Sequence, residues 1–148
     1  MPLRALECAC LQVRLPYVLH LADGSKIHEM RSQPPPRYVT PWTWVWFSTN
    51  QGALKERSEN CCHIVGGAYY YRCEAPIVPG SEGAEAQWRQ CRHTVPMPLQ
   101  EFCDGMGHAG YQKHVYPIEF GMAKQLTTPV AWRGGGMNWS QLTAKNLM

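Results

Sequence analysis

With 148 residues, the chain is long enough for one domain and too short for two. Twelve prolines and thirteen glycines interrupt it every few residues, which excludes long regular helices. The formal net charge of +3 is low for a free-standing nucleic-acid-binding domain, and no run of about twenty apolar residues is present to span a membrane.

The clearest local pattern covers residues 17–31, where apolar and polar residues alternate on both sides of Asp23-Gly24. Asp-Gly between two β-prone runs is a strong hairpin signal, because both residues tolerate positive φ. Residues 33–41 hold three consecutive prolines, which favour an extended strap. We therefore predict that residues 1–40 form a basic antiparallel β-hairpin segment with a Pro-rich strap.

The segment from Trp42 to Phe47 predicts a strand with Trp42, Trp44 and Trp46 on one face. Apolar residues on both faces indicate a core strand, with an interface on one face as the alternative. Base stacking is the least favoured interpretation, because no cations interleave the tryptophans. Further elements are predicted at residues 53–59, 81–92 and 98–105 (helices) and 69–73 (strand). Residues 41–104 are thus predicted to form a small mixed α/β region.

Residues 105–148 show no clear periodicity, yet they contain several large aromatic side chains. Such a composition predicts an extended tail that becomes ordered on partner proteins. The fold class predicted for the whole chain is a small, irregular α+β protein. Its expected parts are an N-terminal antiparallel β-hairpin, short helices and a long, loop-rich aromatic extension.

The seven cysteines lie at positions 8, 10, 61, 62, 73, 91 and 103. A secreted, disulfide-stabilised binding module would leave one thiol unpaired. A zinc site lacks a Cys-x2-Cys knuckle, and adjacent Cys61 and Cys62 are an awkward pair for one ion. A thiol enzyme would need a base, which only the sequences Cys61-Cys62-His63 and Cys91-Arg92-His93 suggest. Without any established catalytic motif, we predict no enzyme activity, no metal, no cofactor and no small-molecule substrate.

One segment carries a family resemblance. Its matching residues are Arg14, Tyr17, Val18, Leu19, Asp23, Gly24, Ser25, Ile27, His28, Arg31, Pro35 and Arg37. On these residues the segment 14–37 resembles the mitochondrial large-subunit ribosomal protein family related to bacterial large-subunit protein thirty-one. The resemblance covers about a sixth of the chain.

The resemblance implies a non-catalytic structural subunit of the large subunit of the mitochondrial ribosome, located in the matrix. Its partners would be ribosomal RNA and neighbouring ribosomal proteins, without a membrane span. The cations expected to contact RNA phosphates are Arg14, Lys26, Arg31 and Arg37. The alternatives are an accessory subunit of a mitochondrial respiratory-chain complex and the secreted binding module.

Overall fold

A computed structural model describes residues 8–49, 62–106, 110–111, 113–132 and 138–142. Six strands form one sheet in the order β2-β5-β4-β3-β1-β6, in which only the β1–β3 pair is parallel. The strands are β1 (Cys8–Gln12), β2 (His28–Arg31), β3 (Trp44–Thr49), β4 (Cys62–Cys73), β5 (Tyr116–Trp132) and β6 (Trp139–Leu142). The helices are α2 (Tyr17–Asp23), α3 (Ala84–Gln90) and α4 (Leu99–Gly105). The predicted α+β class is confirmed.

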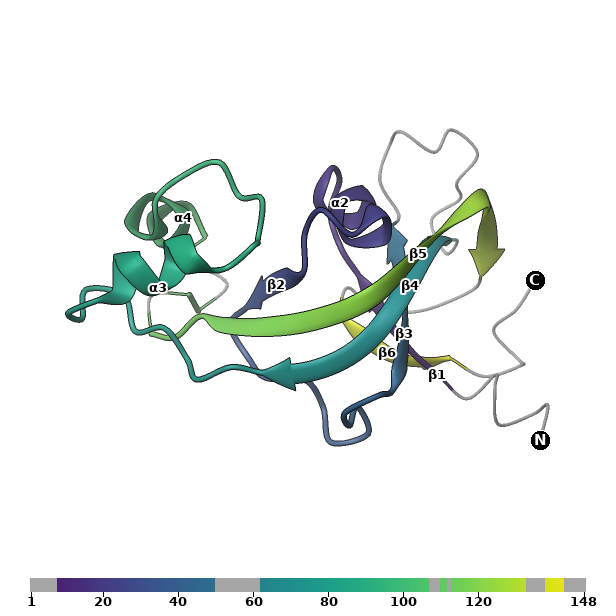
Figure 1. Ribbon diagram of the computed structural model, residues 1–148, viewed down its shortest axis with the longest axis horizontal. Helices are drawn as coiled ribbons and strands as arrows, with labels where there is room; N and C mark the ends of the chain where they lie inside the picture. Colours follow the sequence, from purple (N-terminus) through teal and green to yellow (C-terminus); the bar gives the residue numbers. More distant parts are fainter. Residues whose placement is uncertain (1–7, 50–61, 107–109, 112, 133–137, 143–148) are drawn as a thin grey trace.

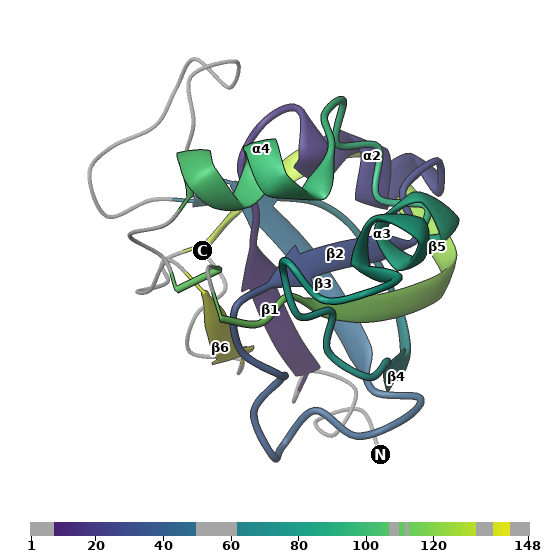
Figure 2. The same cartoon turned by 90° about the vertical axis from the view of Figure 1, so that its left-hand side faces the viewer.

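The long strands β4 and β5 form a curved ribbon on which the other elements are arranged (Figure 1). Helix α2 lies on one side of this ribbon, and α3 and α4 lie together near the end of it where β5 begins (Figure 1). The view from that end shows the sheet curling, with β2 passing in front of β1 and β3 (Figure 2). None of the helices in the described residues is long and apolar enough to cross a membrane.

The predicted hairpin at residues 17–31 is wrong, because its first arm is the helix α2. Val18, Leu21 and Ala22 are buried on one face of that helix, a spacing of three and four residues. Gly24, with φ +85°, ends the helix in the left-handed conformation, so it serves as a helix cap and not as a hairpin turn. The second arm does form a strand, but β2 pairs with the distant β5.

Two apolar clusters stabilise the fold. The larger one packs α2 against the inner face of the sheet and includes Leu21, Phe47 and Phe120. The smaller one joins α3 and α4 to β2 around Trp88, which is among the largest fully buried side chains. The loop that carries residues 91–95 comes directly after α3, and this second cluster therefore fixes its position.

Each of the three predicted segments contributes strands to the one sheet. The segment after residue 105, expected to order on partners, supplies β5 and β6. The predicted helices at 81–92 and 98–105 correspond to α3 and α4, and the predicted strands correspond to β3 and part of β4. The predicted helix at 53–59 lies outside the described residues.

Candidate functional site

Lys26 is the most unusual side chain in the described part of the molecule, because it is a cation with an exposed fraction of only 1%. It follows the cap of α2, where its backbone N–H donates to the carbonyl of His20. The Lys26 ammonium donates to the backbone carbonyl of His93. It also lies 3.6 Å from a Glu29 carboxylate oxygen and 5.3 Å from the centre of the Tyr17 ring.

Burial lowers the pKa of Lys26, and the nearby Glu29 carboxylate partly opposes that effect. Taking an ammonium out of water costs free energy that an apolar side chain of similar length would not cost. A buried amine with a perturbed pKa is therefore a candidate for function rather than for stability.

Three less buried side chains lie beside Lys26 or beside the residues that it contacts. Tyr17 and His20 come from α2, and their rings meet edge to face with centroids 6.2 Å apart. Nδ1 of His20 lies 3.0 Å from the hydroxyl of Thr94, which connects α2 to the loop after α3. Thr94 has φ +58°, a conformation that β-branched residues rarely adopt and that is often found at functional sites. We call Tyr17, His20 and Thr94 the rim of the lysine site.

His93 fixes the loop that contacts Lys26. Its Nδ1 accepts a hydrogen bond from the N–H of Val95, which places the ring proton on Nε2, and Nε2 donates to the carbonyl of Trp88. Burial and the neighbouring Lys26 charge lower the pKa of His93 to about 4. The imidazole is therefore neutral at physiological pH, and both of its nitrogens hold the loop that supplies the carbonyl to Lys26.

The four cations predicted to bind RNA do not form one patch. Lys26 and Arg31 come together through Glu29, whose carboxylate lies 2.8 Å from Arg31 Nε. Arg31 is half-buried, and it also donates to the Gln12 carbonyl and to the Asn138 side chain. Arg14 is exposed before α2, and Arg37 is exposed in the Pro-rich segment. Their contacts with RNA stay a prediction.

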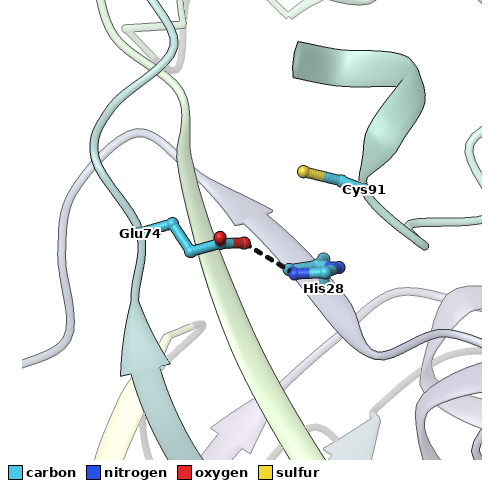
Figure 3. A group of neighbouring side chains, drawn as sticks. All are labelled: His28, Glu74 and Cys91. Carbon is cyan, nitrogen blue, oxygen red and sulfur yellow. Dashed lines mark ion pairs between the residues drawn. The ribbon is translucent and has the colours of Figure 1, made fainter.

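A second group, formed by His28, Glu74 and Cys91, is the one set of potential metal ligands among the described residues (Figure 3). Their ligand atoms lie within 4.8 Å of one another. Nε2 of His28 lies 2.7 Å from a Glu74 oxygen but does not meet hydrogen-bond geometry with it, because the oxygen is off the direction of the N–H bond.

The group does not fit a zinc ion. The backbone N–H of Arg92 donates to Nδ1 of His28, so in the neutral ring Nε2 carries the proton and has no lone pair for a metal. Two nitrogen or oxygen ligands of one tetrahedral zinc would lie about 3.3 Å apart, further than the 2.7 Å seen here. The three residues instead join the start of β2, the end of β4 and the end of α3.

The thiol arrangement considered for Cys91 and His93 gains no support from the geometry. Burial, with the nearby Glu74 and Glu119 carboxylates, raises the pKa of Cys91 to about 11, so that it is a thiol and not a thiolate at neutral pH. Both nitrogens of His93 are already engaged. The other arrangement includes Cys61, which lies outside the described residues.

Comparison with solved structures identifies the architecture. The chain superimposes on a tyrosine-to-phenylalanine variant of ZmASCH from Zymomonas mobilis with a TM-score of 0.65 and 10% identity, covering 94% of this chain and 92% of that one. A serine-to-alanine variant of the same protein gives a TM-score of 0.62 and 10% identity, with 95% and 91% covered. The fold resembles that of ZmASCH. No family model matches the sequence, and no curated protein matches it.

This likeness corrects the functional prediction. A ribosomal structural subunit was expected from the segment 14–37, but that expectation is wrong, because over 94–95% of the chain the fold is similar to that of ZmASCH. The hairpin predicted at residues 17–31, within the segment that carries the resemblance, is absent, since α2 occupies its first arm. The mitochondrial location stays a prediction.

Sequence reasoning missed most of the lysine site. His93 and Thr94 are 67 and 68 positions beyond Lys26, and no local pattern links them to it. Glu29 was not predicted to belong to a site, although it lies three residues after Lys26 and two residues before Arg31, where a carboxylate can pair with both cations. A helix assignment for residues 17–23 would have placed Tyr17 and His20 on the same side of α2, one turn apart.

Proposed function

We infer that this chain is an RNA-binding domain of the ASCH type, and that RNA binds at the rim of the lysine site. The observation that carries this inference is the buried Lys26 ammonium beneath Tyr17, His20 and Thr94. Its hydrogen bond to His93 and its ion pair with Glu29 engage two of its three N–H donors. Since Lys26 is only 1% exposed, the rim side chains must move before its third N–H donor can reach a phosphate or a base of the RNA.

Charge and ring chemistry support RNA as the ligand. Exposed Arg14 lies one turn before Val18 of α2, and exposed Arg92 precedes His93, so each of the two segments that supply the rim carries a cation. Phosphates are attracted to such cations, and unstacked bases pack on rings such as those of Tyr17 and His20. The ASCH-type fold agrees with an RNA partner.

Replacing Lys26 with methionine is expected to weaken binding of a single-stranded RNA by about tenfold or more, because a charge-assisted hydrogen bond contributes roughly 1.5–3 kcal/mol. The free energy of unfolding should change by no more than about 1 kcal/mol. Removal of the buried charge favours the variant. The unpaired His93 carbonyl and the lost ion pair with Glu29 disfavour it, while Glu29 keeps its pair with Arg31. Fluorescence anisotropy with a labelled 15-nucleotide RNA, together with urea unfolding, measures both quantities.

The matched control is Lys113→Met, since Lys113 is an exposed lysine of the loop before β5. That variant should keep RNA affinity within about twofold, as one distant surface charge contributes little. Equal affinity of the wild-type protein and the Lys26→Met variant would rule out the proposed site. A wild-type protein that binds no RNA at any salt concentration would rule out the proposed function.

The expectation that the chain is not an enzyme stays a prediction, and the same samples test it. RNA recovered at full length after prolonged incubation supports it. Shortened or base-modified RNA that disappears with the Lys26→Met variant contradicts it.

A further inference from the structure

A row of five aromatic rings lies on the outer face of β3 and β4. These rings, which we call the aromatic row, belong to Trp42, Trp44, Trp46, Tyr69 and Tyr71. Consecutive ring centres along the row, from Trp46 through Trp44, Tyr69 and Trp42 to Tyr71, are 5.3, 4.9, 6.1 and 5.1 Å apart. The alternate residues Val45, Phe47 and Tyr70 belong to the main core, so the row faces away from it.

Two of these rings pack directly against glycines of the neighbouring strand. A Cβ atom at Gly67 would lie 2.7 Å from the indole of Trp44, and one at Gly121 would lie 2.3 Å from the ring of Tyr71. The rings therefore rest directly on the backbone of β4 and β5. At the other end of the row Trp46 packs against the cluster of Cys10 and Ile64, which anchors it to the sheet.

Trp42, which lies next to the Tyr71 end of the row, is its exposed member. Its side chain is 65% exposed, and its backbone has φ +73°, a strained conformation for a bulky residue. The backbone is held by the hydrogen bond from Trp42 N to the carbonyl of Tyr70, and by the one from Tyr70 N to the carbonyl of Thr43. A fixed backbone that holds a large apolar ring in water, in a strained conformation, indicates a binding surface.

The charges near the aromatic row favour a polyanion as its occupant. Strands β3, β4 and β5 contain one acidic residue, Glu119, and it is paired with Arg72 at 3.0 Å. Exposed Lys124 lies opposite Gly67 in the β4–β5 register, so it shares a face with the Trp44 ring that covers Gly67. The cation that is missing between the tryptophans in the sequence is therefore supplied by the neighbouring strand.

We propose that the aromatic row is a second contact surface for RNA, on which the bases of a single strand stack while Lys124 contacts the backbone phosphates. Rings on an open sheet face stack two or three bases in known single-strand readers, and each stacked base contributes sizeable affinity whatever its identity. This surface shares no residue with the lysine site. It selects single strands, because paired bases have no free faces to stack on the rings.

Replacing Trp42 with alanine tests the proposal on the full chain, with a labelled 15-nucleotide oligouridylate and an RNA duplex of the same length as ligands. The single-strand affinity should fall about tenfold, in keeping with the loss of one stacked base, while the duplex affinity stays within about twofold. Lys124→Ala should reduce the slope of log affinity against log salt by about one, and Trp42→Ala should leave that slope unchanged.

Val78→Ala is the matched control, because Val78 is an exposed apolar residue outside the sheet, 42% exposed, and its loss should leave both affinities unchanged. Trp42→Phe should restore most of the single-strand affinity, which separates stacking from a folding defect. Single-strand affinity of Trp42→Ala within twofold of wild type overturns the proposal, while a loss with Lys26→Met in the same assay keeps the proposed function. A dimer of the chain that Trp42→Ala dissociates without changing RNA affinity also overturns it.

Discussion

Replacing Gly66 with alanine is expected to lower the free energy of unfolding by about 3 kcal/mol, at the upper end of the usual cost of overpacking. A Cβ atom at this position would lie 2.5 Å from the backbone oxygen of Lys124 and 2.8 Å from the Cβ atom of Ala22. The first atom belongs to the backbone of β5, and the second is the point where α2 rests on β4. Neither can move without separating the strands or lifting the helix.

Two other glycines make this result specific. Gly105→Ala meets no atom within 4 Å at the end of α4, so the unfolding free energy should change by no more than about 1 kcal/mol. The three atoms nearest to a Cβ at Gly121 all belong to the outer end of the Tyr71 ring, which can swing into solvent, so the cost of Gly121→Ala should be about 1 kcal/mol. Urea unfolding followed by tryptophan fluorescence gives all three values. A Gly66→Ala protein as stable as the Gly105→Ala protein would show that α2 and β4 are not packed as described.

Lowering the pH from 6.5 to 4 is expected to destabilise the protein by about 3 kcal/mol through His93 alone. Its pKa is about 4 in the folded protein and 6.5 when unperturbed, so between these values the unfolded chain binds more protons than the folded one. Stability therefore rises with pH across this window and is complete above 6.5. The added proton must go to Nδ1, where it would break the hydrogen bond from Val95 N–H.

The test compares unfolding of the wild-type protein with that of the His93→Gln variant from pH 8 to pH 4. Any constant cost of the substitution appears at pH 8, and carboxylates that titrate in this range do so in both proteins. The difference between the two proteins should then shrink by about 3 kcal/mol as the pH falls. If the difference in unfolding free energy between the two proteins stayed constant from pH 8 to pH 4, the assignment of His93 as a buried neutral imidazole would be contradicted.

Local signals predicted the elements that depend on nearby residues. Pro98 begins α4, in which Leu99 and Cys103 are buried, and the sequence alone predicted this helix. The alternation from Trp42 to Phe47 likewise predicted most of β3, although Trp42 itself lies before the strand. In both cases the deciding contacts are between residues a few positions apart.

The rest depends on contacts that sequence spacing does not reveal. Residues 17–23 fit both an alternating strand and a helix, and in the structure they form the helix that places Ala22 against Gly66. The partner of β2 is β5, about ninety residues later, inside a segment that has no clear periodicity. Lys26 was predicted to contact RNA because the family resemblance implied it, and no pattern in the sequence indicated that the structure buries this side chain.

The three bonds of the Arg31 guanidinium have a consequence for the sheet as a whole. Strand β2 is one edge of the strand order, and β1 and β6 are at the other edge. From β2, Arg31 donates to the Gln12 carbonyl of β1 and to the Asn138 side chain just before β6, while it stays paired with Glu29. The Arg31 side chain thus connects β2 to the opposite side of the curled sheet, and the described strands form no backbone hydrogen-bond ladder there. Arg31 therefore holds the end of the edge strand β2 beside the end of β1 and the start of β6. A short edge strand that is fixed at its end in this way is a poor template for a strand of another molecule.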